Sequence, residues 1–127
     1  MDEMFQQEAQ AARAIGLPAG ESVSVDVAND AWQGCGVDGF WIKPLLQDEQ
    51  AGLRTWLMKV DAGAFSDLHA HDEIEQVYVL EGSFYDQHKT YRAGEYILRA
   101  PGALHSAGSE SGAVVLLFYS PTPGKAD

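Results

Sequence analysis

Four side chains of the kinds that ligate metals stand in two separate segments of the sequence. His69 and His71 are one residue apart, Glu75 follows His71 by four positions, and His105 lies in the later segment APGALHS. Alternate residues of a β-strand share a face, so His69 and His71 can approach one ion together. Three imidazoles and a carboxylate suit a divalent transition ion and leave coordination positions open. We consider these four residues candidate metal ligands; the alternative is a set of solvated loop side chains.

We predict no metal-binding role for the fourth histidine, the single cysteine or the other acidic residues near His69 and His71. His88 lies in the polar hairpin DQHKTY, and we assign it no role. Asp67, Asp72 and Glu73 are predicted to be solvated loop charges, although Glu73 is also a candidate for contact with the ligands. Cys35, in QGCGVDG, is predicted to be a small loop residue, neither ligand nor nucleophile.

Short β-strands must position these groups, because helical periodicity is weak after the first 20 residues. Alternating or apolar runs bounded by Gly, Pro, Asp or Ser predict strands at 22–28, 38–46, 53–60, 75–82, 83–86, 95–100 and 113–120. Such spacing is typical of a sandwich or barrel. We therefore predict an all-β fold.

The chain of 127 residues fits one domain. Residues 2–15 have helix-forming composition and the GLPAG that follows is a stop signal, so 1–20 are predicted to form an N-terminal helix or arm. Residues 21–122 then form the barrel, and 123–127 a short tail.

The charge balance excludes two classes of partner. With 19 acidic and 8 basic residues the net charge is −11, which repels phosphate backbones and anionic lipids, so we expect neither nucleic acid nor membrane as a partner. The single cysteine allows no internal disulfide, and the N-terminal stretch lacks the apolar core of a signal peptide. We expect a soluble, cytoplasmic protein.

The segment 63–82, GAFSDLHAHDEIEQVYVLEG, resembles the first motif of the cupin superfamily, G(X)5HXH(X)3,4E(X)6G, at every specified position. Its two glycines, Gly63 and Gly82, flank the ligand-bearing segment. We predict that positive φ or close backbone approach excludes a Cβ at these positions, and that Gly82→Val damages folding more than metal binding.

The second cupin motif, G(X)5PXG(X)2H(X)3N, is matched in part. Gly94, Gly102 and His105 are in register, whereas Ala100 replaces the proline and Ser109 the asparagine. The departures affect turn geometry and leave the histidine in place. Ser109 is not expected to make the side-chain contacts of the asparagine.

Together the motifs and the lead-in cover about residues 37–120. The resemblance implies a double-stranded β-helix (jelly-roll) barrel in which His69, His71, Glu75 and His105 bind the metal. The segments EQVYVLEGSFYDQ and YRAGEYILRAPGALHS are similar to the ChrR-type cupin subgroup, which contains zinc-binding anti-sigma domains, acetylacetone-cleaving dioxygenase and dihydroxyacetophenone dioxygenase. The family also implies a homodimer, through edge strands that would otherwise be exposed.

Other residues that could line the pocket follow from strand alternation. Arg54, Trp56 and Met58 share one face of their strand, and the Trp and Met favour the inward face. An inward Arg54 needs an anion, supplied by a neighbouring carboxylate or by a substrate. Glu73 and Tyr119 are the types of residue required as acid or base. Further pocket candidates are Tyr78, Arg99, Phe118 and Tyr119.

Three functions compete. The favoured one is a metal-dependent dioxygenase acting on a small-molecule substrate of β-diketone or hydroxyketone type, with Fe(II) the favoured ion and Zn, Mn, Ni, Co or Cu as alternatives. The second is a metal or small-ligand sensor; the first 20 residues contain no His or Cys, which argues against a stand-alone anti-sigma role. The third is a metal-assisted isomerase, since cupins support many chemistries.

Overall fold

The computed structural model of the chain describes residues 14–123, which form nine β-strands and one short 3-10 helix. In chain order the elements are η1 (Val27–Asn29), β1 (Gln33–Gly34), β2 (Phe40–Asp48), β3 (Leu53–Val60), β4 (Phe65–His69), β5 (Ile74–Tyr85), β6 (Thr90–Arg92), β7 (Tyr96–Arg99), β8 (His105–Gly108) and β9 (Ala113–Ser120). The predicted all-β fold is confirmed.

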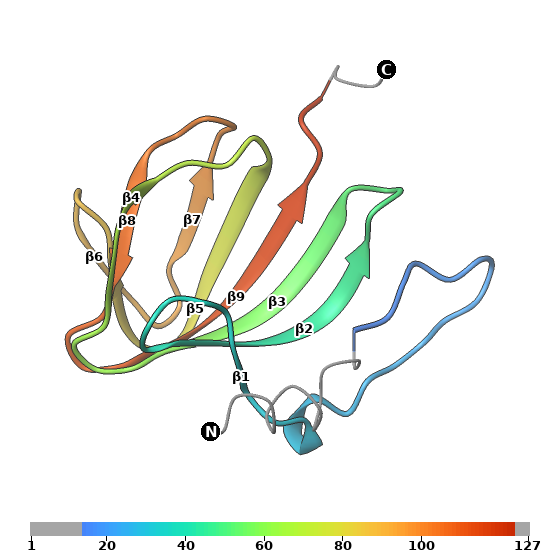
Figure 1. Cartoon of the computed structure of the whole chain (residues 1–127), viewed down its shortest axis with the longest axis horizontal. Helices are drawn as coiled ribbons and strands as arrows, with labels where there is room; N and C mark the ends of the chain where they lie inside the picture. Colours follow the sequence, from blue (N-terminus) through green and yellow to red (C-terminus); the bar gives the residue numbers. More distant parts are fainter. Residues whose placement is uncertain (1–13, 124–127) are drawn as a thin grey trace.

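The strands form one curled antiparallel sheet in the order β1-β2-β3-β9-β5-β8-β4, with β6 and β7 also paired to β5 (Figure 1). The first part of β5 lies between β7 and β9, and its last part pairs with β6 and β8. A β-bulge between Val79 and Glu81 interrupts the β5–β9 register. Bulges bend the strand that contains them, which contributes to the curling of the sheet. The curled sheet is consistent with the jelly roll that the resemblance implies.

The concave side of the sheet holds the core, because alternate residues of each strand point inward. On β9 the buried positions are Ala113, Val115, Leu117 and Tyr119, each separated by one less buried residue. Trp56 and Met58 of β3 pack against the same cluster, as their predicted inward face requires. Candidate metal ligands carried on this side are therefore surrounded by apolar side chains.

Gly82 meets both conditions that exclude a side chain. Its φ is +74°, and a Cβ built there would overlap the carbonyl oxygen of Gly112 and lie 2.9 Å from its carbonyl carbon. Gly63 has φ +86°, and a Cβ added there would have no atom within 4 Å, so only its backbone conformation demands glycine. The two glycines thus differ in how strongly they resist substitution.

Ser109 occupies the same corner of the fold and is fully buried. Its Oγ donates to the carbonyl of Ser83 at 2.6 Å and accepts the N–H of Gly112 at 2.7 Å. The residue that replaces the motif asparagine therefore stabilises a backbone turn rather than the site.

Two of the predicted strand boundaries are wrong, and β1, β4, β6 and β8 lie outside the predicted ranges. Residues 22–28 are not a strand: 27–29 form η1, and the edge of β2 pairs instead with β1 and, through a bridge between Ile15 and Leu46, with the chain before it. Alternation predicts a half-buried surface but supplies no pairing partner. The segments 75–82 and 83–86 are one strand, β5, because Gly82 continues the chain through its positive φ.

The predicted N-terminal helix over 2–15 falls almost entirely outside the described residues, as does the end of the tail. Residues 14–20 contain no helix, and Ile15 pairs with β2. Among residues 14–123 no helix has the length and apolar character needed to cross a membrane.

Candidate metal centre

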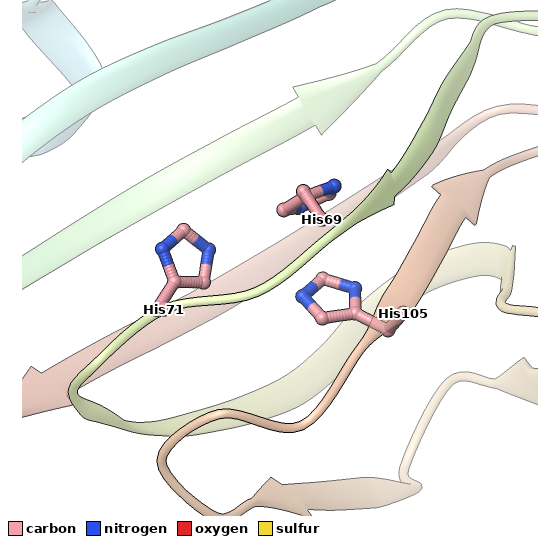
Figure 2. A group of neighbouring side chains, drawn as sticks. All are labelled: His69, His71 and His105. Atoms are coloured by element: carbon pink, nitrogen blue, oxygen red, sulfur yellow. The ribbon is translucent and has the colours of Figure 1, made fainter.

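Three histidines converge on the concave side of the sheet (Figure 2). His69 is the last residue of β4 and His105 the first of β8, and the two are paired in the β4–β8 register. His71 lies just beyond β4, in the turn that leads to β5. One ligand nitrogen from each ring lies within 4.8 Å of the others. The structure thus brings together the three histidines that the sequence analysis selected.

Backbone carbonyls orient two of the rings. Nδ1 of His69 lies 2.8 Å from the carbonyl oxygen of Asp67, and Nδ1 of His105 lies 3.2 Å from that of Ser106. A carbonyl oxygen carries no proton, so in each pair the imidazole Nδ1–H donates. A hydrogen bond from Nδ1 leaves Nε2 of each ring as the nitrogen that can bind a metal.

Glu75, the second residue of β5, is buried beside them. Its Oε1 lies 3.3 Å from Nε2 of His105, and neither atom has a hydrogen-bond partner although both are buried. An imidazole lone pair and a carboxylate oxygen repel each other unless a cation lies between them. Two ligands bonded to one ion at about 2.1 Å are separated by about 3.0–3.4 Å, so this donor set fits a transition metal.

Other neighbours hold the Glu75 carboxylate in place. The Tyr119 hydroxyl donates to Oε2 at 3.3 Å, and Nε of Arg99 lies 3.7 Å from Oε1. Burial alone would raise the pKa of Glu75, but His105, His71 and Arg99 together lower it below its ordinary value. The carboxylate is therefore ionised at neutral pH. Its role as a fourth ligand stays a prediction.

Burial shifts the pKa values of His71 and Tyr119 in opposite directions, and it favours the neutral form of each. It lowers the pKa of His71, and the adjacent His69 and His105 lower it further. It raises the pKa of Tyr119, as does the negative charge of Glu75. At neutral pH His71 is an unprotonated ring able to bind a metal, and Tyr119 is a neutral hydrogen-bond donor.

The histidines and Glu75 line a cavity of about 120 Å³. Its apolar walls come from Phe40, Met58, Phe84 and Leu117, and Tyr119 adds the hydroxyl. An apolar cavity of about 150 Å³ accommodates a molecule the size of benzene, so only a small ligand fits here. Sequence analysis missed three of these wall residues, because the curling of the sheet decides which core side chains face the ligands.

A buried ion pair behind Glu75 was also missed. Arg99 of β7 donates from Nη1 to Oδ2 of Asp86 at 3.0 Å, and the Tyr91 hydroxyl donates to the same oxygen at 3.1 Å. The other oxygen accepts the backbone N–H groups of His88 and Lys89. An Asp at the start of a turn such as DQHK commonly accepts backbone N–H groups of that turn, and this was the sequence signal that could have identified Asp86. The pair fixes Arg99 next to the Glu75 carboxylate.

The three candidates for acid, base or substrate contact, Arg54, Glu73 and Tyr119, form a connected group. Nη2 of Arg54 is 2.7 Å from Oε1 of Glu73, which supplies the anion that an inward Arg54 requires. The Arg54 guanidinium lies 4.0 Å from the centre of the Tyr119 ring. Tyr119 lines the cavity, whereas Arg54 and Glu73 line an adjoining surface pocket.

The other candidates are separated from the centre. Tyr78 and Phe118 are exposed on the convex side of the sheet, because their strands place them one residue out of phase with the inward positions; their assignment to the pocket was wrong. His88 is exposed in its hairpin turn. Cys35 is an exposed loop residue, but it also contributes to the cavity lining, and its thiol donates to the carbonyl of Phe40 at 3.5 Å.

Comparison with solved structures supports the fold. A cupin of the RmlC-like type from Shewanella frigidimarina is 24% identical, with a TM-score of 0.67 over 83% of this chain and 95% of that one. A cupin-like protein of unknown function from Ralstonia eutropha is 25% identical, with a TM-score of 0.60 over 65% of this chain and 55% of that one. The anti-sigma ChrR of Rhodobacter sphaeroides, solved with SigE, is 20% identical, with a TM-score of 0.64 over 72% of this chain and 50% of that one.

This chain therefore spans only about half the length of the last two proteins. A search of curated protein sequences found no significant match. The sequence profile described as the ChrR cupin-like domain, in contrast, matches residues 20–123, which is most of the chain. The chain belongs to the ChrR cupin-like family of the cupin superfamily.

Proposed function

We propose that the chain binds one divalent transition metal ion through His69, His71 and His105, with Glu75 as the fourth ligand. The supporting observation is the buried approach of Nε2 of His105 to Oε1 of Glu75, in which neither atom has a hydrogen-bond partner. Arg99 lies 3.7 Å from Oε1 but makes no hydrogen bond to it, so the facing polar atoms of His105 and Glu75 stay buried without partners, which is unfavourable. A metal ion between them satisfies both lone pairs.

We propose further that the metal-loaded protein is a dioxygenase acting on a small β-diketone or hydroxyketone. Fe(II), the favoured ion, would supply redox chemistry with O2 and a Lewis acid for the substrate oxygens. The walls formed by Phe40, Met58, Phe84 and Leu117 exclude bulk water from the reacting groups. The volume of about 120 Å³ limits the substrate to a small molecule such as acetylacetone.

The chain's own polar groups prepare the site in two ways. The carboxylate of Glu75 is kept ionised by His105, His71 and Arg99 and accepts a hydrogen bond from Tyr119, so it is ready to bind a cation. Its negative charge also reduces the net charge of the loaded site relative to three histidines alone. This weakens attraction for an anionic enolate and favours substrates that bind as neutral ketones.

A metal-assisted isomerase is the second candidate, and Tyr119 is the observation that favours it. Its hydroxyl is neutral, buried and directed at Glu75 within the cavity. A protonated hydroxyl next to an ionised carboxylate is a donor–acceptor pair suited to moving a proton on a bound hydroxyketone.

Elemental analysis of the purified protein tests metal binding. We expect about one transition metal ion per chain in the wild type and a large loss in His105→Ala, because the buried nitrogen is removed. His88→Ala is the matched control, since His88 is the exposed fourth histidine. Equal metal content in both variants would refute the assigned site.

Two activity measurements then separate the functions. Oxygen uptake by iron-loaded protein with acetylacetone, absent in His105→Ala, would support the dioxygenase. Incorporation of solvent deuterium into a hydroxyketone without oxygen uptake would support the isomerase. Stoichiometric zinc with neither activity would instead favour a metal or small-ligand sensor.

A further inference from the structure

The turn between β5 and β6 carries a side chain that contacts the backbone on both sides of His105. Gln87 lies in this turn, in DQHKTY, outside the segments 63–82 and 94–109 that resemble the cupin motifs. Its Nε2 donates to the carbonyl oxygen of Leu104 at 2.9 Å, and its Oε1 accepts the backbone N–H of Ser106 at 3.0 Å. One side-chain amide therefore holds the chain immediately before and immediately after the buried imidazole of His105.

Strand register explains why a side chain makes these contacts. β5 and β8 share one aligned pair, Tyr85 with Gly108. Continuing this antiparallel register by two residues on each strand would place residue 87 opposite Ser106. The backbone cannot follow that path, because the chain turns at Asp86 into the β5–β6 hairpin. The carboxamide of Gln87 offers a donor and an acceptor, as a peptide group does, and continues the ladder in place of the backbone.

The contact with Ser106 bears directly on the His105 ring. Ser106 is 5% exposed, and a buried backbone N–H needs an acceptor, which Gln87 supplies. The carbonyl of Ser106 accepts Nδ1–H of His105 at 3.2 Å. This hydrogen bond sets the orientation of the ring, which extends from the start of β8 toward the other two histidines (Figure 2). Gln87 therefore fixes the residue that orients the ring.

The same turn also reaches Glu75. The residue before Gln87, Asp86, binds Arg99. Nε of Arg99 lies 3.7 Å from Oε1 of Glu75. Two consecutive side chains of the turn thus act on the two facing groups, Nε2 of His105 and Oε1 of Glu75, which are 3.3 Å apart. The turn is therefore placed to control the separation between these candidate ligands.

We propose that Gln87 is a positioning residue for His105: its carboxamide fixes the backbone at the start of β8 so that Nε2 of the ring faces Glu75. Gln87 does not line the cavity, so it acts through the backbone and through Ser106. The expected effect on metal binding rests on the proposed function, whereas the positioning of the ring is a property of the metal-free chain. These two parts can be measured separately.

Titration with Co(II), followed by its visible absorption, tests the effect on the site, because that absorption depends on the number and geometry of the ligands. Gln87→Met keeps the length of the side chain and removes both polar atoms. We expect Co(II) to bind about 10-fold more weakly, with an altered spectrum. Gln87→Glu keeps the acceptor for Ser106 and should recover part of the affinity. His88→Met, the same substitution at the next exposed position, should match the wild type.

Nuclear magnetic resonance of the metal-free protein tests the positioning itself. Gln87→Met should speed amide hydrogen exchange of Ser106 by about fivefold, as loss of one hydrogen bond of ordinary net strength predicts. It should also shift the ring nitrogen signals of His105, whereas His88→Met should change neither. A contact that only stabilises the turn would leave the ring signals of His105 unchanged.

Unchanged His105 ring signals in folded Gln87→Met would overturn the proposal, and so would an equally large loss of Co(II) affinity in His88→Met. A wild-type chain that binds no Co(II), with shifted ring signals in Gln87→Met, would reject the metal site and support the positioning role. Circular dichroism verifies folding, and Gln87→Glu replaces Gln87→Met if the latter is unfolded. Its lost donor to Leu104 should still shift the ring signals.

Discussion

The two glycines of the first motif offer a matched test of backbone conformation against close packing. Gly63 and Gly82 have similar positive φ values, +86° and +74°. Only at Gly82 would a Cβ overlap backbone, at the carbonyl of Gly112. We therefore compare Gly63→Ala with Gly82→Ala, in which the added atom is the same.

The expected loss of stability differs between the two. An L-residue in the left-handed region costs about 1–2 kcal/mol, and Gly63→Ala should lose this much of the free energy of unfolding. At Gly82 the added Cβ also forces the chain away from Gly112, whose carbonyl accepts the N–H of Ser83 at 3.1 Å. Losing that hydrogen bond adds about 1–3 kcal/mol, for a total of about 2–5 kcal/mol.

Urea denaturation followed by tryptophan fluorescence measures both changes, and EDTA removes any contribution from bound metal. In thermal denaturation of the same proteins, we expect Gly82→Ala to lower the melting temperature by about 10 °C or more, and Gly63→Ala by about 5 °C. Metal content per folded molecule should remain near that of the wild type in both, because neither glycine carries a ligand. Equal destabilisation of the two variants would refute the role assigned to Gly112, and loss of metal from well-folded Gly82→Ala would refute the structural role of Gly82.

Three further predictions concern the polar groups around the cavity. Asp86→Ala should cost about 3–5 kcal/mol of stability in urea, because it leaves Arg99 buried without its carboxylate; the exposed Asp67→Ala should change stability by less than about 0.5 kcal/mol. Tyr119→Phe removes one hydrogen bond to Glu75 and should lower the free energy of unfolding by about 0.5–1.5 kcal/mol. Metal content, measured by elemental analysis, should be retained. Loss of the metal would show that the hydroxyl is needed to hold Glu75 in place. The pKa of His71 is lower in the folded than in the unfolded chain, so unfolding takes up a proton, and metal-free protein should lose stability as pH falls below about 6.5. Urea titrations at pH 7.5 and pH 5.5 should show a loss of stability at the lower pH that is absent in His71→Gln. An equal loss in that variant would exclude His71 as its source.

The grouping of His69, His71 and Glu75 as candidate ligands could be predicted from the sequence because their spacing is local. The separation of His69 from His71 and the turn before Glu75 are properties of one short segment, and the glycines around them mark its backbone conformation. Apolar alternation likewise predicted β3 and β9 with their observed bounds, 53–60 and 113–120, since each strand has one face in the core.

Features that depend on contacts between distant segments were not predictable in this way. The alternation of 22–28 resembles a strand, but strand formation needs a free neighbouring edge, and other residues occupy that edge of β2. The ion pair between Asp86 and Arg99 joins a turn to a strand through the interior, and no pattern in either segment specifies its partner. Which core residues form the cavity wall is likewise set by the curvature of the whole sheet.

β4 and β8 lie at one end of the sheet, where few strand pairings attach them to the other strands. β4 pairs only with β8 among the described strands, and β8 joins β5 through a single aligned pair, Tyr85 with Gly108. A metal ion held by His69, His105 and Glu75 would cross-link this loosely attached end to the central strand. His69 and His105 are 36 positions apart, and closing a loop of that length in the unfolded chain is worth about 3–4 kcal/mol by the loop-entropy relation. Removing a bound ion should therefore speed amide hydrogen exchange first in β4 and β8, because the ion proposed here would also stabilise the attachment of these strands.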